Sequence, residues 1–284
     1  MSDRILQELP GWSLAWSDEF DGAAGSPVDP ASWQPEVGGD GWGNQELQYY
    51  TDSRDNARLD GAGNLQIVVR RSDPQPRDHR FGACLYTSAR LITKDRVAFT
   101  YGLVQARIRL PQGRGIWPAF WMLGQDIDRV GWPQCGEIDV MENFGKDPTV
   151  VHGTIHGPGY AGTGGITAAY RSAAELADDF HVYAVRWEPD RIRWYLDDQL
   201  YSTVTPDDLQ GNPWVFDHDF FLLLNVAVGG TFSVSPDSSA TFPQTMLVDY
   251  VRVYASSPTD HPGGGDRRDR RQLRRRRPQA PPAL

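Results

Sequence analysis

The stretch Val104-Gln105-Ala106-Arg107-Ile108-Arg109-Leu110 decides the fold class, because apolar and polar side chains alternate along it without a break. Its four apolar residues fall on one face of an extended chain, and its glutamine and two arginines fall on the other. This period of two is typical of an antiparallel strand with one face buried and the other in water.

Similar short runs recur along most of the chain and are separated by turn-forming residues. Many short strands with turn signals between them indicate a sandwich or a barrel. We therefore predict one all-β domain, an antiparallel β-sandwich of jelly-roll type, over residues 8–256, with no internal repeat or linker. The other predicted strands are Leu65–Arg70, Leu85–Leu91, Val150–His156, Val182–Trp187, Ile192–Leu196, Phe220–Val228 and Met246–Tyr254.

Two further features complete the structural prediction. Only Ser172–Asp179 has a helical pattern, and it is about two turns long. The two cysteines, Cys84 and Cys135, could form one disulfide, but we expect two separate buried thiols.

The charge is divided unevenly along the 284 residues. The net charge is −9, but residues 261–284 carry eight arginines and two aspartates, so the rest of the chain has a net charge of −15. An acidic body argues against nucleic acid as a partner. Residues 257–284 have almost no core-forming side chains, and we predict a disordered Arg/Pro-rich tail.

The sequence shows no membrane or export signal. No apolar run reaches the roughly 20 residues that span a bilayer. Met1–Gly11 lacks the apolar stretch of a secretory signal peptide, so the protein stays in the cytoplasm or its signal lies outside this sequence.

The segment Gly136-Glu137-Ile138-Asp139-Val140-Met141-Glu142-Asn143 carries the strongest functional pattern. In a regular strand Glu137 and Asp139 would share one face, whereas Glu142 would point the opposite way into apolar surroundings. A β-bulge near Val140 and Met141 would add one residue and return Glu142 to the face of the other two acids. We predict this bulge.

Crowded carboxylates are unfavourable as structure alone, since like charges raise one another's pKa and push one acid toward protonation. Glycoside hydrolysis needs that division between an ionised carboxylate and a protonated acid. The alternative from spacing alone is a solvated acidic face on an edge strand. Trp117, Trp121 and Trp132 lie just upstream, and indoles of this kind stack on the apolar faces of sugars, which favours a saccharide cleft.

The residues resemble those of family-16 glycoside hydrolases, and the laminarinase-like endo-β-1,3-glucanases among them. Glu137-Ile-Asp-Val-Met-Glu142 is similar to the bulged ExDxxE signature of that family. The resemblance implies a jelly roll with a concave substrate cleft, and it makes residues 8–256 a catalytic domain. Further matching segments are Trp16–Asp21, Gly41–Thr51, Tyr86–Arg90, Trp117–Trp121, His152–Tyr160, Phe180–Trp187, Asn225–Gly230 and Asp249–Tyr254.

The resemblance also implies roles in a retaining mechanism. Glu137 would be the nucleophile, Glu142 the general acid/base, and Asp139 a hydrogen-bond partner of Glu137. The residues implied to contact sugar are Asn44, Glu46, Arg90, Trp117, Trp121, Trp132, His156 and Asn225.

A structural calcium ion is implied away from catalysis, while catalysis itself needs no cofactor. The matching ligands are the Glu19 carboxylate, the Gly63 carbonyl and Asp249. Strand parity places Asp249 on one face with Leu247 and Val251, and a carboxylate among apolar neighbours needs a partner. An Asp bonded to backbone groups is the alternative.

Other functions remain open at this stage. The same sandwich occurs as a non-catalytic glucan-binding module, but the three acids are intact here. A transglycosylase would use the same residues, and mixed-linkage β-glucan is an alternative substrate, although the shorter ExDxE is the form that lichenases carry. We expect a secreted monomer that acts on β-glucan, because the family is mostly secreted and the polymer cannot enter a cell.

Overall fold

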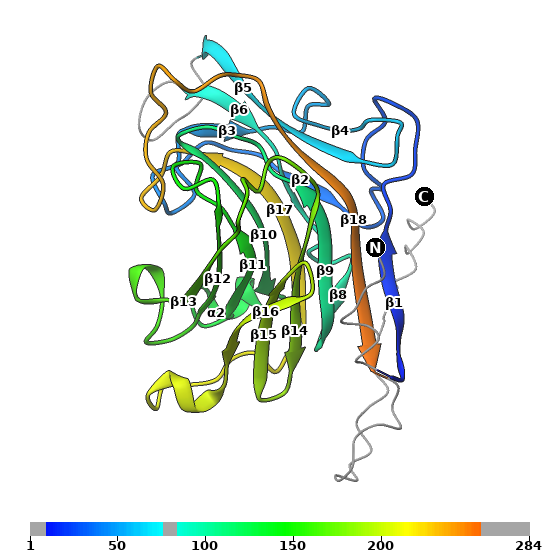
Figure 1. The fold of residues 1–284 in the computed structure, drawn as a ribbon, viewed down its shortest axis with the longest axis vertical. Helices are drawn as coiled ribbons and strands as arrows, with labels where there is room; N and C mark the ends of the chain where they lie inside the picture. Colours follow the sequence, from blue (N-terminus) through cyan, green and yellow to red (C-terminus); the bar gives the residue numbers. More distant parts are fainter. Residues whose placement is uncertain (1–9, 76–83, 257–284) are drawn as a thin grey trace, which may run out of the picture.

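Two stacked β-sheets make up the structure, which is a computed structural model that describes residues 10–75 and 84–256 (Figure 1). Within these residues all strand pairs are antiparallel except β3 with β6. The predicted jelly-roll sandwich is confirmed. The predicted tail, residues 257–284, lies outside the described residues, as do residues 1–9.

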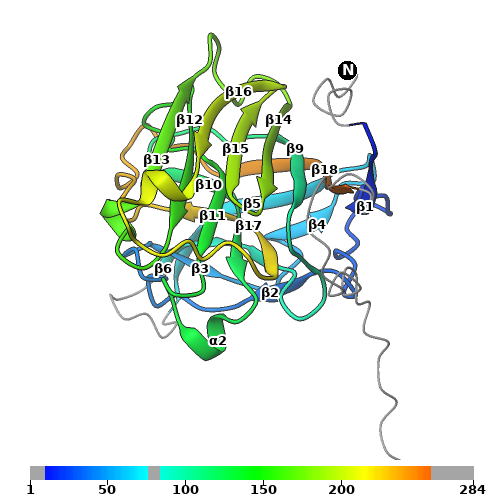
Figure 2. The ribbon, with the colours of Figure 1, turned by 90° about the horizontal axis from the view of Figure 1, so that it is seen from below.

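The first sheet has ten strands in the described ranges, and β14, β15 and β16 lie side by side in it (Figure 2). In spatial order its strands are β16 (Gln199–Val204), β15 (Arg191–Leu196), β14 (His181–Glu188), β9 (Gly102–Arg109), β18 (Gln244–Ser256), β5 (Leu65–Gln75), β6 (Cys84–Ser88) and β3 (Gln48–Tyr50), with β1 (Trp12–Asp18) beside β18 and β4 (Ala57–Leu59) beside β5.

The second sheet has eight described strands and carries the segment with the three predicted acids near its centre. In spatial order they are β13 (Ile166–Arg171), β12 (Val150–His156), β11 (Glu137–Glu142), β10 (Ile116–Gly124), β17 (Phe220–Val228), β7 (Arg90–Ile92) and β2 (Gln34–Glu36), with β8 (Ala98–Phe99) beside β17. The described helical elements are α2 (Ile127–Val130), η1 (Gly162–Gly164) and η2 (Pro206–Leu209). None of them is long and apolar enough to span a bilayer.

The core lies between the two sheets and follows the predicted alternation. On β9, Val104, Ala106 and Ile108 are fully buried as predicted, and Arg109 on the opposite face is exposed. Gln105 on that opposite face is only 1% exposed, so the prediction of a face in water is wrong at this position. From the second sheet, β10 and β17 add inward side chains to the same core. Burial on one face of each sheet leaves the outer face of the eight-stranded sheet available for a site.

The helix predicted over Ser172–Asp179 is wrong. The segment consists of turns and bends, and the backbone N–H groups of Ser172 and Leu176 bond to the carbonyls of Thr149 and Pro148. These cross-chain bonds take the place of the bonds that a helix would make to its own carbonyls four residues earlier. Only Leu176 of the segment is buried, so one anchor holds it as an irregular loop.

The two cysteines are separate, as expected. Cys84 lies on β6 and Cys135 lies just before β11; both are buried, and no disulfide joins them. Burial, with the charge of Glu137 nearby, raises the pKa of the Cys135 thiol to about 11. This thiol therefore stays protonated near neutral pH.

Candidate active site

Strand β11 contains the predicted bulge. Asp139 pairs with Trp121 on β10 and with Thr154 on β12, whereas Glu142 pairs with Ala119 and His152. From Asp139 to Glu142 there are three steps along β11 but only two along each neighbour, so β11 holds one extra residue. The prediction of a bulge is confirmed.

The bulge resets the strand parity as the segment requires. Ile138, Val140 and Met141 are buried in the core between the sheets. Glu137, Asp139 and Glu142 instead line a cleft on the outer face of the second sheet. Before the strand, Gly136 has a φ of 72°, a left-handed conformation that favours glycine and turns the chain into β11.

The cleft has a volume of about 670 Å³ and gathers residues from distant parts of the chain. It is lined by all the residues that were predicted to be catalytic or sugar-binding, namely Asn44, Glu46, Arg90, Trp117, Trp121, Trp132, Glu137, Asp139, Glu142, His156 and Asn225.

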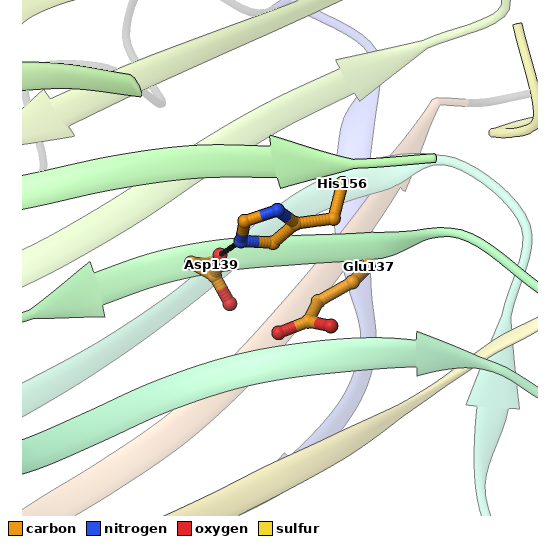
Figure 3. Close-up of side chains that lie close together, drawn as sticks. All are labelled: Glu137, Asp139 and His156. Atoms are coloured by element: carbon orange, nitrogen blue, oxygen red, sulfur yellow. Dashed lines mark ion pairs between the residues drawn. The ribbon is translucent and has the colours of Figure 1, made fainter. Parts of the chain in front are cut away.

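The side chains of Glu137, Asp139 and His156 lie close together, with a polar atom of each within 4.8 Å of the others (Figure 3). The His156 Nε2 atom is 3.4 Å from the Asp139 Oδ2 atom, and the carboxyl groups of Glu137 and Asp139 are hydrogen-bonded to each other. Burial, with the charge of Asp139 beside it, raises the pKa of Glu137 to about 8. Burial and the charge of Glu142 raise the pKa of Asp139 well above its usual range.

Glu142 is held by an indole from the neighbouring strand. Trp117 Nε1 donates a hydrogen bond of 2.9 Å to Glu142 Oε1. Only 6% of Trp117 is exposed, and its ring packs on Phe144 and Phe232, so it presents an N–H edge rather than an open stacking face. Burial and the charge of Glu137 raise the pKa of Glu142 to about 7, while this N–H lowers it.

Glu137 also accepts a hydrogen bond from an indole N–H, that of Trp132. Trp132 differs from Trp117 because 46% of it is exposed, so its ring is open to a ligand in the cleft. Each glutamate therefore has its own indole donor. Three carboxyls this close titrate as one set, and at neutral pH the set retains at least one proton.

One end of the cleft is built around Arg90. Its guanidinium carbon lies 4.7 Å from the ring centre of Trp42 and 4.8 Å from that of Trp121, and Glu36 pairs with its Nε atom. Trp121 is fixed further by a hydrogen bond of 2.7 Å from its Nε1 to Asn225 Oδ1. This cation–π stack orders two indoles on one wall of the cleft.

Glu46 is a buried acceptor on the same wall. Its carboxylate accepts hydrogen bonds from Gln48, Asn44 and Tyr50 at 2.6, 3.2 and 3.3 Å. Burial raises the pKa of Glu46, and the nearby Arg90 charge opposes that rise. Three donors already engage Glu46, so its main contribution is to hold Asn44 and Tyr50 in place.

The comparisons agree with this geometry. The family model "Glycosyl hydrolases family 16" matches residues 43–252. The chain belongs to this family.

The family-16 chain is similar in sequence and fold to several known proteins over most of its length. It is 46% identical over 266 residues to a beta-glucanase of Rhodothermus marinus, covering 89% of this chain and 88% of that protein. The laminarinase catalytic domain of Thermotoga maritima aligns with a TM-score of 0.81 at 45% identity, over 87% of this chain and 99% of that one. The endo-beta-1,3-glucanase of Pyrococcus furiosus aligns with a TM-score of 0.81 at 46% identity, over 87% and 95%. The protein is a glycoside hydrolase.

Several residues of the hydrolase cleft were not predicted. His152 and Thr154 line the cleft beside His156, because alternate residues of β12 share one face, but only His156 was predicted to contact sugar. Trp42 belongs to a segment that resembles the family, but it lies in a turn with a φ of 49°, so strand periodicity does not predict which way its side chain points. Phe144 and Phe232 reach the cleft from loops, and no local periodicity indicates such positions.

The predicted calcium ligands do not form a ready-made site in the family-16 fold. Arg252 pairs with both oxygens of Glu19, and Arg107 Nη1 lies 2.6 Å from Asp249 Oδ2. Calcium would have to displace an arginine from each carboxylate, so no step of the chemistry is assigned to it.

The parity argument for Asp249 is also wrong. A register shift between Val248 and Tyr250 separates Asp249 from the face of Val251, and Asp249 pairs with Arg107 instead of lying among apolar side chains. The calcium ion itself stays a prediction.

Proposed function

We propose that this hydrolase cuts internal β-1,3 linkages of laminarin-type glucan and keeps the β configuration. The observation that carries the proposal is the bulge at Val140, which places Glu137 and Glu142 in one tryptophan-lined cleft. The similar proteins from Thermotoga and Pyrococcus, a laminarinase and an endo-beta-1,3-glucanase, support this linkage.

In the first step Glu142 donates its proton to the glycosidic oxygen while the Glu137 carboxylate attacks the anomeric carbon. The bond to the leaving sugar breaks and a glycosyl–Glu137 ester forms. Because Trp117 N–H is directed at Glu142 Oε1, the acidic proton resides on the other carboxyl oxygen. The indole thus decides which oxygen protonates the substrate.

In the second step Glu142, now ionised, removes a proton from water, and the water oxygen attacks the anomeric carbon of the ester. The Glu137 carboxylate is the leaving group, and Trp132 N–H stabilises its returning charge. Two displacements restore the β configuration.

Asp139 and His156 manage the proton of the nucleophile. Glu137 must be ionised to attack, but burial and the Asp139 charge oppose ionisation. A proton that Asp139 holds and shares with Glu137 removes that repulsion, and His156 beside Asp139 favours negative charge on the pair. With the proton on Asp139, Glu137 is the ionised member of the pair.

Product analysis on three polymers tests the substrate. We expect laminarin and curdlan to yield a ladder of β-1,3 oligosaccharides early in the reaction, with slower release from lichenan. Faster cleavage of lichenan than of laminarin would make the protein a mixed-linkage glucanase. Products longer than the starting oligosaccharide would indicate a transglycosylase, and binding without cleavage would indicate a glucan-binding module.

Three further properties belong to the proposal. The protein acts as a monomer on polysaccharide, without nucleic acid or membrane as partners. It works outside the cell, where polymeric glucan is found. A structural calcium ion at Glu19, Gly63 and Asp249 remains a prediction, and its test is given below.

A further inference from the structure

Trp194 contacts the catalytic strand from the opposite side of the core. It lies on β15 in the ten-stranded sheet, whereas β11 belongs to the eight-stranded sheet (Figure 1). The side chain is 1% exposed, and its Nε1 donates a hydrogen bond of 2.8 Å to the backbone carbonyl of Asp139. Asp139 is the last residue in regular register before the bulge.

Gly153 on β12 makes room for this contact. It stands between Thr154, which pairs with Asp139, and His152, which pairs with Glu142, so it faces the bulge. A Cβ atom on Gly153 would lie 2.3 Å from Trp194 Cδ1 and 2.7 Å from Trp194 Nε1. The indole ring is rigid and buried, so a side chain at this position would displace its N–H edge.

A bulge interrupts the ladder of a sheet, and a buried carbonyl at the interruption needs a donor. We propose that Trp194 is a positioning residue, whose N–H holds the Asp139 carbonyl and thereby fixes the bulge that sets Glu142 against Glu137. Trp194 acts through the backbone of β11 and touches no substrate. The inference rests on the proposed function, because it concerns the placement of the acid/base.

The effect of losing this contact is specific to one step. A catalytic group that moves by about 1 Å can lose about 10²-fold in rate. The tryptophans that line the cleft are not altered, so substrate binding is maintained. A displaced Glu142 slows substrates whose leaving group needs a proton more than substrates whose leaving group departs as a stable anion.

The test is Trp194→Phe, which removes the N–H and keeps an aromatic ring. We expect kcat on laminarin to fall by about tenfold or more, with KM changed by less than about twofold. On an aryl β-laminaribioside with a dinitrophenolate leaving group, we expect the rate of the first step to fall by less than about threefold. Gly153→Ala should give the same difference between the two substrates, because the added methyl group moves the indole away from the Asp139 carbonyl although the N–H itself is kept.

Trp187→Phe is the matched control. Trp187 lies on β14 in the same sheet, is fully buried, and donates a hydrogen bond of 2.9 Å to the carbonyl of Phe216, outside β11. Its loss should lower the melting temperature as Trp194→Phe does but leave kcat unchanged.

Two results would overturn the inference: equal kcat in the Trp187 and Trp194 variants, or equal losses on laminarin and on the aryl substrate. If Trp194→Phe does not fold, Gly153→Ala decides by the same two measurements. A wild-type protein that does not cut laminarin would refute the proposed function instead.

Discussion

At the scale of single residues, ionising the buried glutamates of the site costs free energy. Burial raises the pKa of Glu137 to about 8 and that of Glu142 to about 7, since water is removed from both and like charges are close. A carboxyl whose pKa is higher in the folded state than in the unfolded chain binds more protons when folded. Its contribution to stability is present at low pH and is lost as the pH rises toward the folded-state pKa.

Glu137→Gln should therefore stabilise the protein in a pH-dependent way. Below about pH 4 both side chains are neutral, and we expect equal melting temperatures. Between about pH 4.5 and 8 the wild type loses stability while the amide does not, so the variant should melt several degrees higher at pH 8. Melting curves from pH 4 to pH 8 measure the difference.

Glu19→Gln, studied in EDTA, is the control of opposite sign. The hydrogen bonds and charge of Arg252 hold the pKa of Glu19 below its usual value. Its stabilising effect is thus present above the unfolded-state pKa and is lost as the pH falls. The Glu19 variant should melt below the wild type at neutral pH and approach it in acid. A Glu137 effect that does not change with pH would show that ionisation is not its cause.

At the scale of elements, the bulge determines the chemistry of β11. The sequence predicted it because Glu142 stands at the wrong parity for Glu137 and Asp139, and burying it would be costly. Parity failed at Asp249, where the same conflict between a carboxylate and apolar neighbours was assigned to a calcium ion, whereas the structure resolves it with a register shift in β18 and an ion pair to Arg107. The prediction of a helix at Ser172–Asp179 was wrong for another reason. Helix propensity is a local property, whereas the N–H groups of this segment bond to the carbonyls of Pro148 and Thr149, which lie far away in the sequence.

Changing the length of β11 tests the parity argument. Deletion of Val140 gives Glu-Ile-Asp-Met-Glu, in which a regular strand keeps all three acids on one face. We expect this variant to lose about 2 kcal/mol of stability with the buried valine but to remain at least about tenfold more active on laminarin than Glu142→Ala.

Insertion of one alanine after Val140 serves as the comparison. It shifts Glu142 by one more residue, so a bulge of the original size would turn its side chain toward the core. Activity on laminarin should fall to the level of Glu142→Ala, and the melting temperature should drop. An insertion variant with nearly full activity would mean that the bulge does not set the parity.

At the scale of the whole molecule, sequence reasoning found the sandwich and the catalytic part of the cleft, but fewer than half of the residues that line it. Short alternating or apolar runs located β9, β12 and β17, and the resemblance supplied Asn44, Arg90 and other predicted cleft residues. It could not supply Phe144 or Phe232, because loops bring them to the cleft only after folding. Trp194 was equally hidden, since its partner is a backbone atom of the other sheet.

A bound calcium ion would stabilise the whole folded domain. A ligand that binds only the folded state at about 100 times its Kd adds about 2.7 kcal/mol. For a domain of this size, that would raise the melting temperature by about 5 to 10 °C. If the ion binds at Glu19, Gly63 and Asp249, added Ca²⁺ should raise the melting temperature and EDTA should lower it.

Asp249→Ala should abolish the calcium response, whereas Asp190→Ala, which alters an exposed turn residue outside the predicted ligand set, should retain it. A wild-type melting curve that responds to neither reagent would remove the site. The carboxylates of Asp249 and Glu19 would then keep their ion pairs with Arg107 and Arg252 in place of the metal.

The most direct test of the central claim, that Glu137 is the nucleophile and Glu142 the acid/base of a double displacement, is azide rescue of Glu142→Ala. On an activated aryl β-laminaribioside the ester with Glu137 still forms, because the leaving group needs no proton. Azide needs no base to attack this α-linked ester from the β face. We predict faster turnover with azide and a β-glycosyl azide as the product, identified by proton NMR, while Glu137→Ser gives no β-glycosyl azide. No acceleration, or an α-glycosyl azide from Glu142→Ala, would contradict the account.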